Sequence, residues 1–170
     1  MKLDVPFHRQ KTDYTCGPAA LQMVFGYFKD FISQEELAQK AKTDKENGTT
    51  NQHMIETVRK NGFFCYVNDN STLNEIKHFI ELGLPVIVNY IEPSDNEGHF
   101  AVVSGCTRRN LILNDPWNGK GFVLKQSDFM ERWRNQSGTH PQWIMVVSGE
   151  DFHLGKQYGP VSNSSLNNYK

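Results

Sequence analysis

A cysteine stands immediately before a helical pattern near the start of the chain, where its thiol could act as a nucleophile. Cys16 begins the run Cys-Gly-Pro-Ala-Ala, and the apolar residues that follow recur at helical spacing. The unpaired N–H groups and the dipole of a first helical turn stabilise negative charge, so a thiol there ionises more readily. Because a thiolate attacks carbonyl carbon atoms, this position favours acyl-transfer chemistry.

Acyl transfer by a cysteine also needs a base, a group that orients the base, and donors for the oxyanion. His99 begins an apolar, strand-like run, and Asp115 follows the end of the next such run. If residues 108–110 form a tight turn between these strands, the Asp115 carboxylate lies beside the His99 ring and sets its tautomer. Gln10, six residues before Cys16, is predicted to place an amide N–H beside the backbone N–H of Cys16 as an oxyanion hole.

Each of these residues has a structural interpretation when it is taken alone. A cysteine at a helix start often fills space, a histidine in a strand is usually structural, and Asp-Pro commonly starts a turn. Their combination favours catalysis, because one hairpin gives all of them compatible roles. A zinc site formed by Cys16, His99 and Asp115 is the competing interpretation, but it lacks a fourth ligand and a short ligand pair such as Cys-x-x-Cys. We therefore expect no metal ion and no organic cofactor.

The elements that position these residues follow from the periodicity of the sequence. Ser33 with Glu36 and Thr72 with Glu75 have the spacing of capping boxes, and Asn51 is predicted to cap a third helix. We expect helices over residues 16–28, 33–42, 51–61, 72–82 and 127–133, and strands over 63–67, 85–90, 99–106, 110–114, 120–124 and 142–147. Helices first and strands later indicate an α+β fold, with an antiparallel sheet packed beside helices.

Length and composition are those of one globular domain. The chain has 170 residues, of which 22% are charged, and a net charge of −1. We expect the domain to span residues 1–148, followed by a polar, partly disordered tail at 149–170. No basic stripe with interleaved aromatic residues is visible, so nucleic acid is not an expected partner. The longest apolar runs have the length of a strand, so we expect no membrane segment.

The N-terminus and the cysteines indicate a compartment. Residues 1–6 lack the apolar region of a signal peptide, so we expect a cytoplasmic protein, with signal-independent secretion as the alternative. Three cysteines leave one unpaired in any disulfide scheme, and reduced thiols are the simplest interpretation. The sequence indicates no oligomeric state.

Three sequence blocks together resemble those of a known family. The blocks are Gln10-x5-Cys16-Gly17-Pro18-Ala19-Ala20, Gly98-His99-Phe100-Ala101-Val102-Val103-Ser104-Gly105 and Asn114-Asp115-Pro116. They resemble papain-like cysteine peptidases, in the branch that includes the double-glycine leader peptidases of bacteriocin exporters and their free-standing relatives. The resemblance covers residues 5–147. It implies a papain-like fold, with Cys16 as nucleophile, His99 as base and acid, Asp115 as orienting residue and Gln10 as oxyanion donor.

We therefore predict a thiol hydrolase that cleaves a peptide or isopeptide bond of a peptide or protein substrate through an acyl-enzyme. Transpeptidase, transglutaminase-like and deamidase reactions use the same intermediate and are alternatives. A non-catalytic peptide-binding module that retains the triad is another. The loop that carries Glu92, Asp95 and Glu97 leads directly into His99, so we expect it to flank the cleft and to favour cationic substrates. The alternative for this loop is a solvated surface without substrate contact.

Overall fold

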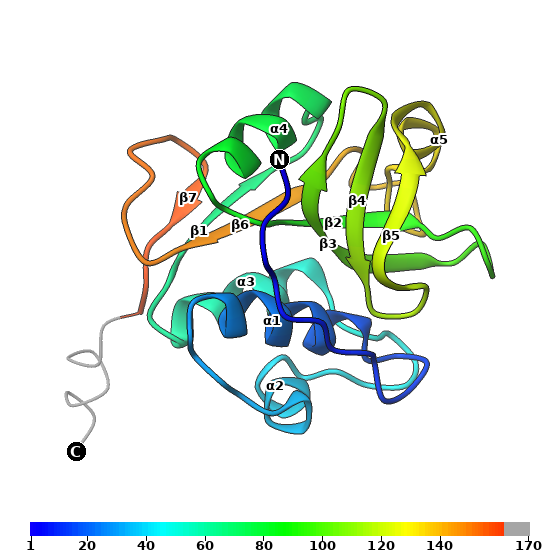
Figure 1. Ribbon diagram of the computed structural model, residues 1–170. Coiled ribbons are helices and arrows are strands. Elements are labelled where there is room, and N and C mark those ends of the chain that lie inside the picture. The colour runs from blue at the N-terminus through cyan, green and yellow to red at the C-terminus, as the bar shows by residue number, and fades with distance from the viewer. Residues whose placement is uncertain (162–170) are drawn as a thin grey trace, which may run out of the picture.

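The fold is a seven-stranded sheet with helices on both faces. The computed structural model describes residues 1–161, and residues 162–170 lie outside the described part (Figure 1). The helices are α1 (Cys16–Tyr27), α2 (Gln34–Lys40), α3 (Asn51–Lys60), α4 (Leu73–Glu81) and α5 (Gln126–Arg132). The strands are β1 (Phe64–Asn68), β2 (Val86–Ile91), β3 (Gly98–Cys106), β4 (Asn110–Asp115), β5 (Gly119–Lys125), β6 (Ile144–Ser148) and β7 (Gln157–Tyr158). The predicted α+β class is confirmed.

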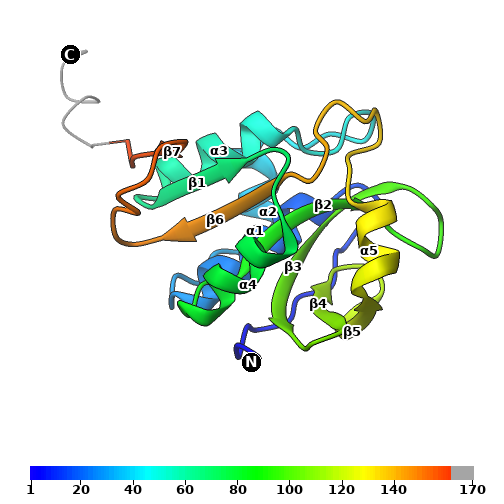
Figure 2. The same ribbon diagram turned by 90° about the horizontal axis from the view of Figure 1, so that it is seen from above.

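The sheet is antiparallel throughout, in the order β5-β4-β3-β2-β6-β1-β7. Helices α1, α2 and α3 gather on one face, and α4 and α5 lie toward the other (Figures 1 and 2). Residue alternation along the strands explains this arrangement, because successive side chains point to opposite faces. Phe100 and Val102 of β3 join the core beneath α1, whereas Ala101 and Val103 join the core beneath α4. Both faces of the central strands are therefore buried.

The helix starts follow the predicted capping pattern with one exception. Ser33 accepts a hydrogen bond from the Glu36 N–H, and Thr72 accepts one from the Glu75 N–H. The prediction that Asn51 caps the third helix is wrong. Thr50 is the cap: its backbone is extended and its side chain accepts from the His53 N–H, which frees the Asn51 amide for another contact.

The first residues of the chain form an extended lead-in that lies along the sheet. The Leu3 N–H donates to the Ser104 carbonyl at 2.7 Å, the Asn114 amide donates to the Val5 carbonyl at 2.9 Å, and the Gln10 N–H donates to the Pro116 carbonyl at 3.1 Å. These contacts run from β3 to the end of β4. They bring the start of α1, six residues after Gln10, to the same end of the sheet.

The C-terminal segment was predicted as a tail beginning at residue 149. Within it, Gln157 and Tyr158 form β7, which pairs with β1 at the edge of the sheet. The domain boundary itself stays a prediction, and residues 162–170 of the predicted disordered tail lie outside the described residues. Over residues 1–161, no helix combines the length and the apolar character needed to cross a bilayer.

Candidate active site

Cys16 is the first residue of α1, and its neighbours keep that helix end open. Thr15 precedes it as the N-cap but makes no side-chain capping bond; its hydroxyl bonds to Thr12 instead. The first N–H groups of α1 are therefore left available to an anion. Gly17 is required by close packing, because a Cβ there would lie 2.6 Å from the Thr49 hydroxyl oxygen. Pro18 is tolerated because a first helical turn does not need its N–H.

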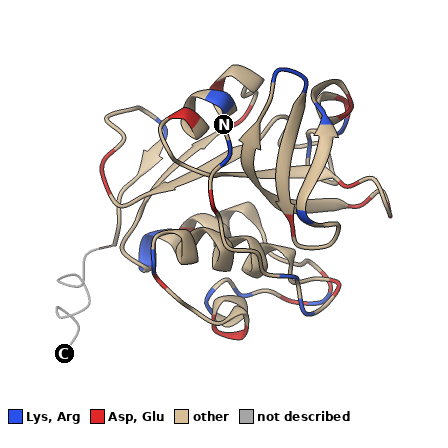
Figure 3. Ribbon diagram, in the orientation of Figure 1, with Lys and Arg blue, Asp and Glu red and all other residues tan. Residues whose placement is uncertain are grey.

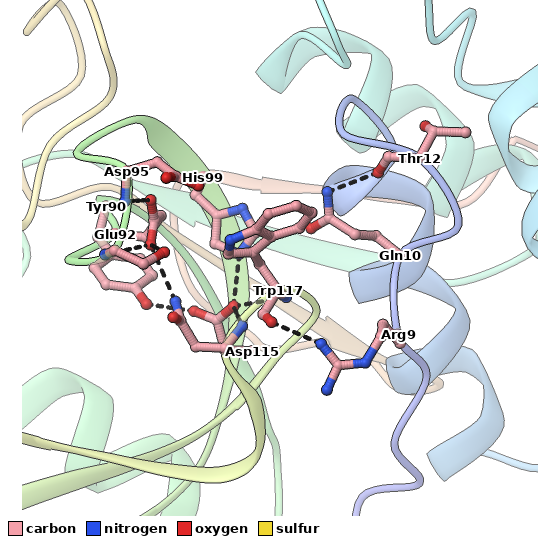
Figure 4. A network of polar contacts seen from close by, with 11 residues as sticks. Arg9, Gln10, Thr12, Tyr90, Glu92, Asp95, His99, Asp115 and Trp117 are labelled. Atoms are coloured by element: carbon pink, nitrogen blue, oxygen red, sulfur yellow. Dashed lines mark hydrogen bonds and ion pairs between the residues drawn. The ribbon is translucent and has the colours of Figure 1, made fainter.

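His99 and Asp115 are in direct contact, as the hairpin model predicts. The His99 Nε2 donates to Asp115 Oδ1 at 2.8 Å (Figure 4). Strands β3 and β4 pair antiparallel, with a bulge at Ser104, and this pairing brings the end of β4 to the start of β3. His99 is 6% exposed and Asp115 is fully buried. The ion pair is therefore shielded from water, which strengthens it.

Asp115 accepts four hydrogen bonds, and three of its partners are not predicted by the sequence pattern. Besides His99, it accepts from the Tyr90 hydroxyl and from the backbone N–H groups of Trp117 and Asn118, both at 2.9 Å. Tyr90 lies opposite His99 in the β2–β3 register. Pairing the apolar run of residues 85–90 with the one that starts at His99 would have been the sequence signal for Tyr90. Burial raises the Tyr90 pKa, so its hydroxyl stays protonated and donates.

The charges of the three central residues depend on one another. Burial alone would raise the pKa of the Cys16 thiol, but the adjacent His99 outweighs burial and lowers it. Burial alone would lower the His99 pKa, but the Cys16 thiolate and the hydrogen bond to Asp115 raise it to about 10. Burial opposes ionisation of Asp115 too, yet His99 holds its pKa at about 2. Each of the two charges therefore stabilises the other, which favours a thiolate–imidazolium pair.

No metal site accompanies this arrangement within residues 1–161, where no group of three histidine, cysteine or acidic side chains could hold an ion. Cys16, His99 and Asp115 form a chain of contacts with His99 in the middle. Asp115 accepts from the His99 Nε2, and His99 is the group that lowers the Cys16 pKa, so both outer residues act on the imidazole. This geometry suits proton transfer rather than metal binding.

Gln10 lies beside Cys16 but is oriented differently from the prediction. Its side-chain nitrogen donates to the Thr12 carbonyl at 2.8 Å. Its oxygen has no hydrogen-bond partner among the described residues, and Figure 4 shows it on the side of His99 and Trp117. The nitrogen keeps a second hydrogen. The Gln10 side chain therefore faces the cleft with an acceptor oxygen, and one of its two amide N–H groups is not used in the hydrogen bond to Thr12.

Two cavities meet at Cys16 and His99. The first, which we call the acidic cleft, has a volume of about 270 Å³ and is lined by Gln10, Asp13, Cys16, Glu92, Asp95, Glu97, Gly98, His99 and Trp117. The second, which we call the amide cleft, has a volume of about 710 Å³ and is lined by residues 46–52, 98–100 and 135–137 together with Cys16, Asn89, Thr139 and His140. Gly98 belongs to both, and a Cβ there would lie 2.8 Å from the Gln136 nitrogen. Only glycine fits between the two cavities.

The loop before His99 lines the acidic cleft, as predicted, but its three carboxylates are not equivalent. Glu92 is 3% exposed. It accepts hydrogen bonds from the Ser94 N–H and hydroxyl, from the Asp95 N–H and from the Asn118 amide. Burial alone would raise its pKa, but these donors outweigh burial and lower it. Glu92 is therefore an internal anchor for the loop, whereas Asp95 and Glu97 are exposed.

Comparisons with known proteins agree with this geometry. The family model described as "Peptidase C39 family" matches residues 4–137. The transport/processing ATP-binding protein MesD of Leuconostoc mesenteroides is 29% identical over 141 residues, which are 78% of this chain and 19% of MesD. The chain thus spans about a fifth of that relative.

Solved structures show the same fold. The peptidase domain of Streptococcus ComA superposes with a TM-score of 0.69 at 24% identity, covering 84% of this chain and 97% of that domain. A double glycine motif protease from an AMS/PCAT transporter, in complex with its leader peptide, superposes with a TM-score of 0.69 at 20% identity, covering 86% and 92%. The predicted papain-like peptidase fold is confirmed.

Proposed function

The chain belongs to the peptidase C39 family and is a cysteine peptidase, and we propose that it cleaves peptide or isopeptide bonds through Cys16, His99 and Asp115. One observation carries the proposal. The imidazole of His99 is close enough to the thiol at the helix start to lower its pKa, and it donates to a fully buried carboxylate at 2.8 Å. A structural histidine would not need both an adjacent thiol and a buried carboxylate, and a structural thiol would not need a lowered pKa.

The reaction follows from the charges of the free protein. The Cys16 thiolate attacks the substrate carbonyl carbon and forms a C–S bond, and the oxyanion that develops is held by the Cys16 N–H at the open end of α1. Gln10 adds the spare hydrogen of its amide nitrogen. The His99 imidazolium then donates its proton to the leaving nitrogen as the C–N bond breaks, which leaves a thioester. Neutral His99 finally takes a proton from water, and hydroxide addition releases the acid and the thiolate.

Asp115 and its neighbours keep His99 in one orientation throughout these steps. The carboxylate accepts from His99, Tyr90 and two backbone N–H groups, so it cannot turn away when the imidazole changes charge. This rigidity supports a positioning role for Asp115, because a base acts well only when its ring is held within hydrogen-bond reach of the reacting atoms.

The relatives suggest which substrates to test first. MesD is named a transport/processing protein, and the AMS/PCAT enzyme is described as a double glycine motif protease bound to its leader peptide. We infer that a leader segment of a peptide precursor is the first substrate class to examine. Three unpaired thiols, Cys16, Cys65 and Cys106, support a reducing compartment such as the cytoplasm as the place of action.

The test is detection of the acyl-enzyme by intact mass. Peptide thioesters or esters offered to the full chain should add their acyl mass to Cys16, and Cys16→Ala should show neither the adduct nor turnover, a loss of about 10⁴-fold or more. Adding an amine separates the reaction types, since a transferase gives the amide and a hydrolase gives the acid. Turnover that persists in Cys16→Ala would refute the proposal.

A further inference from the structure

The acidic cleft carries a charge that the proposed reaction does not use. Its lining includes four carboxylates from two segments of the chain: Asp13 precedes α1, and Glu92, Asp95 and Glu97 lie in the loop between β2 and β3. Figure 3 shows acidic residues in that loop, which projects from the ends of β2 and β3. No lysine or arginine lines the cleft. The cleft therefore presents acceptors and negative charge without an internal counter-ion.

Glu92 shapes this surface rather than serving as one of its charges. Its four hydrogen bonds bind the loop to itself through Ser94 and Asp95, and to the β4–β5 turn through Asn118. Asn118 also donates its backbone N–H to Asp115. The loop is thus fixed relative to the buried carboxylate of the active site, and Asp95 and Glu97 are held at the cleft instead of moving freely in solvent.

The neighbouring cations make no ion pair with the carboxylates of the cleft. Arg9 donates to the Trp117 carbonyl at 2.7 Å, and Lys11 pairs with Glu35. Arg132 contacts the loop itself, donating to the Ile91 carbonyl at 3.1 Å and to the Asn96 side chain at 3.0 Å. Among the ion pairs of residues 1–161, none includes Asp13, Asp95 or Glu97. Within residues 1–161, these three carboxylates of the cleft are therefore free of direct ion pairs.

A second, independent feature also requires a donor in this cleft. The Gln10 side chain is 8% exposed, and its oxygen accepts from no described group although it lies on the side of His99 and Trp117 (Figure 4). A buried acceptor without a partner destabilises the folded protein. A ligand that donates a hydrogen bond would remove this cost, whereas a carboxylate or an apolar ligand would not.

We propose that the acidic cleft is the subsite for a basic side chain, lysine or arginine, of a peptide substrate. The inference rests on the proposed function, because it places that side chain within reach of a carbonyl at Cys16. Asp13, Asp95 and Glu97 attract the cation, and the Gln10 oxygen accepts one of its N–H groups. The Trp117 side chain lines the cleft and is 42% exposed, so its ring is available for a cation–π interaction with the basic group.

The experiment measures how fast matched probes label Cys16 in the full chain. Tetrapeptidyl acyloxymethyl ketones carry alanine at every position except one, which holds lysine or its uncharged isostere norleucine and is scanned along the peptide. Labelling forms a C–S bond as the carboxylate leaves. At one position the lysine probe should label about tenfold faster than the norleucine probe at low salt, and the advantage should shrink in 0.5 M salt.

Paired variants assign the preference to the cleft. Asp95→Asn/Glu97→Gln should bring the lysine-to-norleucine ratio down toward one. The control Glu81→Gln/Glu150→Gln removes the same charge from α4 and from the segment after β6, and it should keep the ratio. Iodoacetamide labelling of Cys16 needs no subsite and reports whether each variant is folded.

The possible failures are distinguishable. Equal, rapid labelling by the lysine and norleucine probes at every position would overturn the subsite and leave the cysteine peptidase proposal standing. A lysine preference that both double variants retain would move recognition away from the acidic cleft and overturn the inference as well. Failure of every probe and of iodoacetamide to label Cys16 selectively would overturn the proposed function together with the subsite.

Discussion

The two clefts that meet at Cys16 and His99 differ in how they can recognise a substrate. In the acidic cleft, Asp13, Asp95 and Glu97 are exposed charges, which cost the folded protein little because they remain hydrated. In the amide cleft, the residues that face the chemistry are mostly neutral: Glu46 and His140 are the titratable groups besides the two that are shared. Recognition there must rely on hydrogen bonds and shape.

The amide cleft contains two buried polar atoms without a partner among the described residues, whereas the acidic cleft contains one, the Gln10 oxygen. Asn89, which is buried in β2, donates to Asn51 at 3.5 Å, and this leaves the Asn89 oxygen and the Asn51 nitrogen without partners. Exchanging oxygen and nitrogen in both amides would still leave one donor and one acceptor unused. The comparison teaches that exposed charges at a cleft cost the folded protein little free energy, and that their attraction for a ligand weakens with salt. Buried amides without partners cost more free energy, and their hydrogen bonding does not depend on salt.

The largest predicted effect concerns the residue that serves both clefts equally. Asp115→Asn should lower kcat by about 10²- to 10⁴-fold for substrates of either charge, because the His99 tautomer is no longer fixed. Stopped-time hydrolysis of a lysine peptide and its norleucine counterpart measures this. Asp128→Asn, an exposed change on α5, is the control for charge. If kcat fell for only one of the two peptides, Asp115 would act on recognition in one cleft and not on His99, which lines both clefts.

The pH dependence of Cys16 labelling tests the interaction between Cys16 and His99, the two titratable residues that line both clefts. The Cys16 pKa is lowered by His99, so the thiolate persists as pH falls below the ordinary thiol range, and iodoacetamide should still label Cys16 at pH 6. Burial raises the Cys65 pKa, so that thiol should stay unlabelled. Mass mapping of each cysteine against pH gives the two curves.

In Asp115→Asn, the His99 pKa should fall from about 10, because the carboxylate that raises it is gone. The imidazolium then supports the thiolate over a smaller pH range. Because the Asp115 charge itself raises the Cys16 pKa, its loss does not move the acid limb to higher pH, and the change should appear as slower Cys16 labelling around neutral pH. Superimposable curves for the wild type and the variant would contradict the proposed coupling between Asp115 and Cys16.

The smallest effect belongs to the amide cleft. Asn89→Leu should raise the free energy of unfolding by about 1 kcal/mol, since it removes a buried oxygen that has no partner and adds apolar surface of similar size. Asn89→Asp should lower it, because an unpaired carboxylate at the same place is harder to bury. Urea denaturation of both variants measures the change. If Asn89→Leu were less stable than the wild type, the Asn89 side chain would make a stabilising interaction in the folded protein, and the prediction would be wrong.

Local signals predicted much of the fold and the central contact. Capping boxes at Ser33 and Thr72 and the turn before Asn110 are short-range patterns, and the His99–Asp115 contact needs only that one hairpin be correct. The chemical roles of these residues stay a prediction.

Contacts between segments that are far apart in the chain could not be predicted from the sequence. The partnership of Glu92 with Asn118, the facing of Asn51 and Asn89, and the orientation of the Gln10 amide each depend on how separate loops pack. Glu92 illustrates the reason. Its residue type and position in an acidic loop indicated a surface charge, but the donors that bury it come partly from a turn 26 residues away.

The lead-in along the sheet also affects how the molecule folds. The Asn114 amide meets the Val5 carbonyl across 109 residues of sequence, and Arg9 meets the Trp117 carbonyl across 108. Closing such long loops is entropically slow compared with forming a local hairpin. The β3–β4 hairpin can therefore form early, whereas the start of α1 reaches it only when the lead-in is in place. Selective reactivity of Cys16 should consequently return with the last phase of refolding. The rate of its return would then report when the native state is complete.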